Sequence, residues 1–469
     1  MRRHRPSELL TEIAAVSIAI APDGMWDSRT GGLCFPWSLA VTARESIRAG
    51  TEHRKSGVTR HDLAQICEIY NNLFDPIADD NDVLATLVRS AFEQFPFQES
   101  LYFGIARSRL LFEKPSPQIT GKLKIVDAAF WQNVTGQPLD TFLDTGLLLG
   151  VGALRNGGLF DLAWFKQPNF APIAQHLSED TVRTLMHDAF ATDTVAYKSM
   201  CPSSYKRGLE RVSFNPLLVR PFLHQADERF LAPIPQFVFW RASAPSLYYI
   251  ALDHLSGSDR NDFTDDVGEL FEDYVVRQAL QLPLEQPVQR EIEYESGKKS
   301  TDAILVWPGF ILLVEAKATR LTEESRAGGS TLRTEIDRTI GRAFEQLDTT
   351  AKLIHDRHPA FDHLPVGLPI YGAVVTLEPY HFINTPLGRS EIAKDPSIPV
   401  VVTSVQNFER FVADAIADPV DANQMLELLD DNGKTWKIDD LIRRNLAAGH
   451  RNPMLDVEFT TMANFGTST

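Results

Sequence analysis

A proline–glycine pair between two apolar runs constrains the fold of this chain more than any other feature. Pro308-Gly309 is a turn dipeptide, so the sequence predicts a hairpin of two antiparallel strands, over 301–307 and 310–318. If the hairpin is symmetric about the turn, residues at equal distances from the turn face each other. The pattern therefore predicts both the strands and their register.

That register brings three charged side chains together. Asp302 lies directly opposite Glu315, with Cβ atoms ~5 Å apart. Strand alternation places Lys317 on the same face as Glu315. Facing carboxylates destabilise a sheet and raise the pKa of one of them, and a divalent cation removes that cost. The sequence therefore predicts a site for Mg²⁺ or Mn²⁺, where a lysine can orient water or stabilise a developing phosphorane charge.

An ordinary ion pair at the strand ends is the alternative interpretation of this pattern. For a generic Glu-x-Lys sequence that interpretation would be preferred. It is weaker here because Asp302 falls at the register that the turn predicts, within strands otherwise unsuited to charge.

The elements around the hairpin predict an α/β (α+β) fold with a mixed sheet flanked by helices. A helix over about 266–280 and a strand over 288–295 precede the hairpin. A long amphipathic helix over 334–355 follows it, and strands over 370–377 and 400–404 complete the order.

The length of 469 residues is too great for one ordinary core, so we expect several domains. Residues 1–215 show mostly helical periodicity and form the predicted recognition or regulatory domain, which a proline-rich connecting segment over 216–261 follows. The polar stretch 256–266 is the expected boundary. The predicted sheet then occupies 262–420, and 421–469 reads as a helical tail.

The charged residues of the hairpin resemble the PD-(D/E)XK nuclease superfamily, which has the restriction-endonuclease-like fold. Thr301-Asp302 stands where the family has Pro-Asp, and Glu315-Ala316-Lys317 matches its Glu-x-Lys; the proline is absent. The resemblance implies that Asp302, Glu315 and the Ala316 carbonyl hold the metal, and that Lys317 positions or activates the attacking water.

The resemblance extends to two flanking helices. Family members place a glutamate on the helix before the first strand, and the segment 268–274 resembles that helix in Mrr-type and archaeal resolvase-like members. Glu272 lies nearer the apolar stripe of this helix than Glu269, so Glu272 is the expected acid and Glu269 the alternative. The resemblance implies that Glu272 also serves the metal site, through a second metal ion or a water. Many members also carry a glutamine on the helix after the Glu-x-Lys strand, a place that Gln346 occupies here.

Several basic residues are candidates for contact with a phosphate backbone. Arg338, Arg342 and Gln346 follow one another at four-residue spacing and form a row on one side of the predicted helix. A solvated helix face is the alternative for this row. Weaker candidates near the predicted sheet are Lys298, Lys299 and Arg320.

Net charge and cysteine content limit the class of protein. With 46 basic and 62 acidic side chains the net charge is −16, which argues against binding nucleic acid through bulk charge. Cys34, Cys67 and Cys201 form no Cys-x-x-Cys pair and fit a reducing cytoplasm. The basic and apolar start resembles a signal peptide, but Glu12 interrupts it and Pro22 disfavours cleavage, so we expect a cytoplasmic protein without membrane spans.

The resemblance implies a Mg²⁺- or Mn²⁺-dependent deoxyribonuclease, an endonuclease rather than an exonuclease, as the C-terminal module of a bacterial restriction or anti-phage defence protein. The implied partners are DNA, a protein encoded nearby, and further subunits in a homo-oligomer or hetero-complex. Two alternatives stay open. The domain could be an inactive scaffold or nucleic-acid-binding subunit of a defence complex, or the protein could be an RNA-cleaving toxin.

Overall fold

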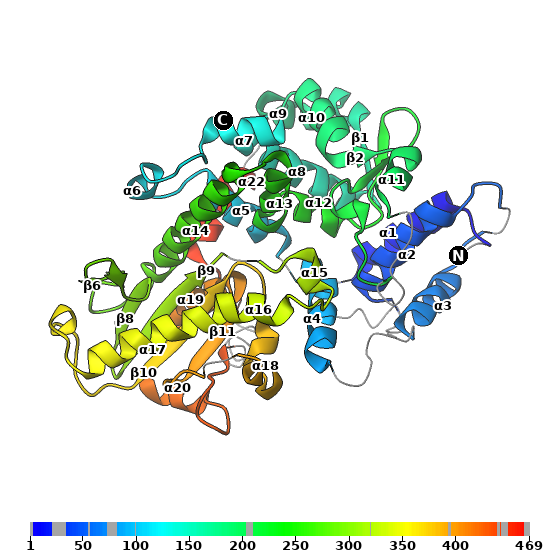
Figure 1. The fold of residues 1–469 in the computed structure, drawn as a ribbon. Coiled ribbons are helices and arrows are strands. Elements are labelled where there is room, and N and C mark those ends of the chain that lie inside the picture. The colour runs from blue at the N-terminus through cyan, green and yellow to red at the C-terminus, as the bar shows by residue number, and fades with distance from the viewer. Residues whose placement is uncertain are drawn as a thin grey trace.

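A helical upper lobe and a lower lobe built on a β-sheet make up the molecule (Figure 1). It is a mixed α/β protein with a mostly helical N-terminal region, as predicted. This computed structural model describes residues 3–20, 34–54, 57–72, 82–98, 100–202, 210–318, 320–392, 395–438, 441 and 449–463.

The N-terminal region is a succession of short helices with one small sheet. The helices are α1 (Pro6–Ala19), α2 (Pro36–Ala49), α3 (Arg60–Asn71), α4 (Val83–Gln94), α5 (Leu101–Phe112), α6 (Pro117–Thr120), α7 (Ala128–Thr135), α8 (Leu139–Arg155), α9 (Ala171–His176), α10 (Glu179–Leu185), α11 (Thr194–Met200), α12 (Gln236–Arg241) and α13 (Ala244–His254). The small sheet has the order β1-β4-β3-β2, from β1 (Leu159–Asp161), β2 (Ala191–Thr192), β3 (Phe222–His224) and β4 (Arg229–Leu231). A π-helical turn, Met186–Phe190, joins α10 to β2.

The main sheet follows helix α14 (Ser258–Ala279) and has the order β11-β10-β9-β8-β5. Strands β8 and β9 are antiparallel, β9, β10 and β11 are parallel, and β5 is antiparallel to β8. The strands are β5 (Gln289–Arg290), β8 (Ala303–Trp307), β9 (Phe310–Lys317), β10 (Ile370–Thr376) and β11 (Val400–Ser404). Its remaining helices are α15 (Glu323–Arg326), α16 (Leu332–Ile336), α17 (Arg342–His355), α18 (Pro386–Ser390), α19 (Val405–Ala417), α20 (Ala422–Glu427) and α22 (Pro453–Ala463).

The hairpin register is confirmed. Trp307 pairs with Phe310 across the turn, and the ladder continues to Ala303 opposite Val314. Gly309 at the turn has a φ of 99°, a left-handed conformation that favours glycine. The strand predicted over 288–295 is instead interrupted: β5 ends at Arg290, and β6 (Glu293–Glu295) turns away to pair with β7 (Lys298–Lys299).

Alternate residues of the hairpin enter two different apolar cores. Ala303, Leu305 and Trp307 pack in the core that contains α14 and α19, whereas Ile304 and Val306 pack in the core that contains α16 and α17. Because the period is two, Asp302, Glu315 and Lys317 are directed toward the α17 layer. Helix α17 is thus the element whose side chains meet the predicted site.

The first of these cores does not stop at the predicted domain boundary. It runs from α5 and α8 of the upper lobe through α14 to β8, β9 and α19. The polar stretch 256–266 is helical from Ser258, so α14 begins earlier than predicted. Asp266 in this stretch binds another segment of the same chain, where its carboxylate accepts hydrogen bonds from the backbone N–H groups of Ile125 and Val126. The stretch predicted as a domain boundary is therefore part of a tertiary contact.

Within this core, a buried network of hydrogen bonds and one ion pair connects the two lobes. The guanidinium of Arg107, on α5, forms an ion pair with the Glu409 carboxylate on α19, and both side chains are almost fully buried. The Tyr274 hydroxyl of α14 donates to Glu409 Oε1 at 2.6 Å, and the Gln278 amide donates to the Tyr274 hydroxyl at 2.9 Å. Asn452 completes the network by donating to Gln278 Oε1 at 2.6 Å.

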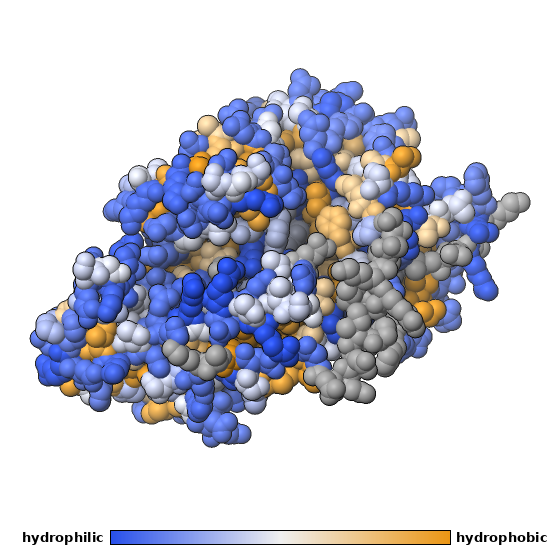
Figure 2. All heavy atoms as spheres, in the orientation of Figure 1, coloured by the Kyte–Doolittle hydropathy of each residue, from blue (hydrophilic) through white to orange (hydrophobic). Residues whose placement is uncertain are grey.

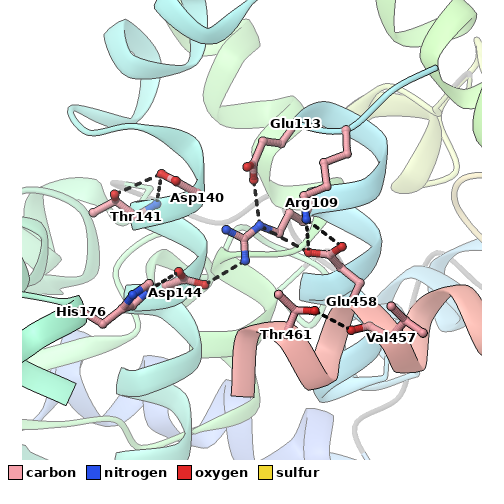
Figure 3. A network of polar contacts seen from close by, with 10 residues as sticks. Arg109, Glu113, Asp140, Thr141, Asp144, His176, Val457, Glu458 and Thr461 are labelled. Atoms are coloured by element: carbon pink, nitrogen blue, oxygen red, sulfur yellow. Dashed lines mark hydrogen bonds and ion pairs between the residues drawn. The ribbon is translucent and has the colours of Figure 1, made fainter. Parts of the chain in front are cut away.

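The C-terminal helix α22 returns to the upper lobe and packs on α5 (Figure 3). Glu458 of α22 accepts hydrogen bonds from Lys114 Nζ at 2.9 Å and lies 3.5 Å from Arg109 Nε. Arg109 also reaches Asp144 on α8 at 3.4 Å, and His176 bonds the other Asp144 oxygen at 2.9 Å. The predicted tail is thus helical at α20 and α22, and its last helix is built into the N-terminal half.

Helices α1, α2 and α3 pack in a third apolar cluster, which includes Leu9, Leu39 and Leu63. They share it with other segments of the chain, at Phe97, Tyr197, Leu217, Leu223, Leu231, Ile234 and Phe237. No described helix combines the length and apolar character needed to cross a bilayer.

Candidate active site

The hairpin ends at a compact cluster of charged side chains. The last pair of the hairpin ladder is Ala303 with Val314, and Asp302 and Glu315 are each one residue beyond it. The backbone N–H of Ala316 donates to Asp302 Oδ2 at 2.7 Å. Lys317 Nζ forms an ion pair with Glu315 Oε1 and donates to Gln346 Oε1 at 3.0 Å. Four of the predicted site residues, from two strands and one helix, therefore meet at one point.

Burial gives this cluster an unusual charge state. Glu315 is 0% exposed and Asp302 is 7% exposed. Burial, and then the neighbouring Glu315 carboxylate, raise the pKa of Asp302. Burial raises the pKa of Glu315 to about 7, although Lys317 acts in the opposite direction. The facing acids that the register predicts are thus held together with only one lysine to offset them.

Glu272 approaches the same cluster from α14. Burial raises the pKa of Glu272, and the charges of Asp302, Glu291 and Glu269, in this order, raise it further. Glu269, the alternative acid, is directed toward Lys122, with Glu269 Oε2 at 3.8 Å from Lys122 Nζ. The geometry therefore favours Glu272 as the helix acid.

The donor set suits a hard divalent cation. Glu315 Oε2 is buried and has no hydrogen-bond partner, which is costly unless a cation occupies the space beside it. The N–H and C=O of a strand residue point to the same neighbouring strand, so the Ala316 carbonyl lies on the side of Asp302. Within the described ranges, no three or more His, Cys, Asp and Glu side chains are arranged to hold an ion by themselves. The fitting set is accordingly two carboxylates and one carbonyl.

Arg338 and Arg342 lie exposed on the helix that carries Gln346. Arg338 belongs to a π-helical turn, Asp337–Gly341, between α16 and α17, and such turns are frequent at functional sites. Neither arginine forms an ion pair in the part of the chain that the structure describes. Two uncompensated cations thus extend the row that begins at Gln346.

The three weaker basic candidates have different outcomes. Lys298 and Lys299 are exposed on β7, where they pair with Glu295 at 2.7 Å and Glu291 at 2.6 Å. For them nucleic-acid contact stays a prediction. For Arg320 the prediction is wrong, because its side chain is only 2% exposed.

Arg320 is buried because it joins the lobes. It donates to the Pro245 carbonyl at 2.7 Å and lies over the Tyr248 ring at 4.2 Å. Its charge faces Glu378, which is fully buried and also binds Arg326 through both oxygens. The sequence places Arg320 only three residues after Lys317, but it does not show that Arg320 is buried, since Glu378 and Tyr248 are remote in sequence.

Glu291 is a site residue that sequence reasoning missed. Its charge raises the pKa of both Glu272 and Asp302, and it holds Lys299 at 2.6 Å. The available signal was an acid within the strand predicted over 288–295, at a position that lies between β5 and β6 in the structure.

Comparison with known proteins found no matching family model, no matching curated protein and no matching solved structure. The resemblance to PD-(D/E)XK nucleases therefore stays a prediction. What supports it is the local geometry of Asp302, Glu315, Lys317 and Gln346.

The carboxyl cluster predicts that the metal-free protein loses stability as pH rises. A carboxyl whose pKa is higher when folded binds its proton more tightly in the folded state. Its stabilising contribution is therefore complete below the unfolded pKa and is lost as pH rises through the folded pKa. For Glu315, whose pKa rises from 4.5 to about 7, this window spans those two values.

We expect the free energy of unfolding in EDTA, measured with urea from pH 5 to pH 8, to fall by on the order of a few kcal/mol. Glu315→Gln should flatten the profile. A free energy that rises with pH over this window in the wild type would contradict the prediction.

Proposed function

We propose that this chain is a divalent-metal-dependent nuclease that hydrolyses phosphodiester bonds of DNA. The observation that carries the proposal is the meeting of Asp302, Glu315, Lys317 and Gln346 at the end of one hairpin, with a Glu315 oxygen buried and unsatisfied. A structural ion pair would need only Glu315 and Lys317. The second buried acid and the glutamine on Lys317 are what a nuclease site requires in addition.

Each residue has a role that its contacts support. Asp302, Glu315 and the Ala316 carbonyl would hold Mg²⁺ or Mn²⁺, which would supply positive charge to a phosphodiester oxygen as a Lewis acid. Lys317, held between Glu315 and Gln346, orients the attacking water or stabilises charge on the phosphorane. Gln346 keeps the ammonium of Lys317 in place. Glu272 adds a third negative charge near the metal position.

The shape and charge around the site favour an extended, anionic substrate. Figure 2 shows the surface hollowed between the lobes, with strongly hydrophilic side chains on its lower side over α16 and α17. In the view of Figure 1, β9 and α16 lie beneath this hollow. Arg338 and Arg342 offer local positive charge in a chain whose net charge is −16. The substrate would thus be held by a local row of cations rather than by bulk attraction.

Replacing both Arg338 and Arg342 by alanine should weaken DNA binding without removing catalysis. If each contacts one phosphate, the slope of log K against log salt should become shallower by about 2. Fluorescence anisotropy in Ca²⁺ measures binding, and cleavage at saturating DNA should change little. Arg357→Ala provides a control, since Arg357 is exposed beyond the end of α17 and lies near Asp362. An unchanged salt slope in the double variant would contradict the role.

The test of the function is cleavage of supercoiled, linear and single-stranded DNA, with and without Mg²⁺ or Mn²⁺. RNA is assayed in parallel. Metal-dependent DNA cleavage that Glu315→Gln abolishes is the expected result. Cleavage of RNA alone would identify an RNA-cleaving protein, and metal binding without cleavage of any substrate would identify an inactive nuclease-like scaffold.

The setting of this activity belongs to the same proposal. The three cysteines are free thiols, which fits the bacterial cytoplasm. The family resemblance suggests restriction or anti-phage defence, with a protein partner encoded nearby or further subunits in a complex.

A further inference from the structure

Two arginines of the upper lobe, Arg220 and Arg241, are in contact with no acid among the residues that the structure describes. Arg241 ends α12 and is 7% exposed. Its Nε donates to the Ala189 carbonyl at 3.2 Å, and Arg220 donates through one terminal nitrogen to the His187 carbonyl at 3.2 Å. Across the described residues, neither guanidinium forms an ion pair.

Both arginines are attached to the same short piece of backbone. His187 and Ala189 belong to the π-helical turn Met186–Phe190, so the two guanidinium groups bind carbonyls two residues apart in one turn. They are close enough for the charge of Arg220 to act on Arg241. Their mutual repulsion and burial lower the pKa of Arg241 to about 9, with burial the larger cause. Burial likewise lowers the pKa of Arg220.

In the absence of an anion this arrangement is costly for Arg241, whose side chain is buried, whereas Arg220 is only half-buried. A guanidinium has five N–H donors, and each of these two spends one on a backbone carbonyl. Buried charges in proteins are normally paired, because desolvation of an unpaired ion costs several kcal/mol. The nearest acids that act on them, Asp188 for Arg220 and Asp253 for Arg241, make no contact with them.

We propose that Arg220 and Arg241 form a binding site for a small phosphate ligand, either inorganic phosphate or the terminal phosphate of a nucleotide. Planar guanidinium groups match the oxygens of a phosphate, and two of them at one place neutralise its charge. The burial of Arg241 restricts access to a small or terminal group and excludes the continuous backbone of a duplex. The site lies in the upper lobe and is independent of the proposed nuclease residues.

The full chain is titrated with inorganic phosphate by calorimetry, in EDTA and at constant ionic strength, with pyrophosphate and a nucleoside monophosphate as separate arms. We expect saturable binding, weakened at least about tenfold by Arg241→Gln and by Arg220→Gln. The arm with the highest affinity identifies the source of the phosphate. Glu315→Gln should bind phosphate as the wild type does, so failure of the nuclease proposal would leave this one intact.

Arg229→Gln is the matched control. Arg229 is exposed on β4 of the same lobe and, like Arg241, donates through Nε to one backbone carbonyl, that of Ala226 at 3.4 Å. We expect its phosphate affinity to equal that of the wild type. Without phosphate, Arg241→Met should melt at the wild-type temperature or above it, because an unpaired buried cation is removed.

Three results would overturn the proposal. The wild type could bind none of the three phosphate compounds saturably, or Arg241→Gln could bind phosphate as tightly as the wild type does. An oligonucleotide that lacks terminal phosphates could also displace bound phosphate as well as free phosphate does.

Discussion

Replacing Lys317 by alanine should abolish phosphodiester cleavage while the protein stays folded. The ammonium of Lys317 is held between Glu315 and Gln346, at the point where negative charge would develop during hydrolysis. Removing one such preorganised group lowers kcat by about 10²–10³-fold or more. Because Lys317 is not a metal ligand, the variant should still bind Mn²⁺, and its KM for DNA should change much less than its kcat.

Two further variants make the Lys317 test specific. Lys352 is exposed on α17, the helix that carries Gln346, and Lys352→Ala should cleave DNA at the wild-type rate. Gln346→Ala should lower kcat by less than Lys317→Ala, because it removes a contact to the lysine rather than the charge itself. Cleavage by Lys317→Ala at close to the wild-type rate in Mg²⁺ would exclude the proposed mechanism.

Replacing Glu409 by alanine should greatly lower the free energy of unfolding, far more than the loss of an exposed ion pair does. Arg107 would then be a buried cation without its anion, and the Tyr274 hydroxyl would lose its acceptor. Breaking a buried ion pair in this way costs about 3–5 kcal/mol. Since the network joins α5, α14 and α19, we expect both lobes to lose stability together, in a single urea transition followed by circular dichroism and by tryptophan fluorescence.

An exposed ion pair provides the comparison for Glu409. Arg451 and Asp456 lie 3.0 Å apart, with the Arg451 side chain 70% exposed, so Asp456→Ala should cost less than about 1 kcal/mol. Two separate transitions in Glu409→Ala, with the sheet lobe melting at its wild-type midpoint, would show that the lobes are energetically independent.

The hairpin and its register could be predicted because both depend on local chemistry. A turn dipeptide centred between two apolar runs determines which residues face each other, and strand alternation then determines the shared face. The same locality made the helix over 334–355 predictable in extent, but not the π-helical turn within it. That turn has no distinct composition in the sequence.

The predictions that were wrong concern residues whose contacts come from segments remote in sequence. The polar stretch 256–266 was predicted as a domain boundary, but Asp266 within it binds the backbone N–H groups of residues 124–126, a pairing that only tertiary structure reveals. Arg320 looked available for DNA because Glu378 and Tyr248, which bury it, are distant in sequence. The lack of an acidic partner for Arg220 and Arg241 could not be predicted either, since a sequence does not show which cations lack contact with an acid.

The separate apolar cluster of α1, α2 and α3 has a consequence for motion. These helices pack in a smaller cluster than the core that joins the lobes, and they share it with Tyr197, Leu223 and Phe237 of the upper lobe. We therefore expect the backbone amides of these helices to exchange hydrogen at a lower opening free energy than those of the sheet.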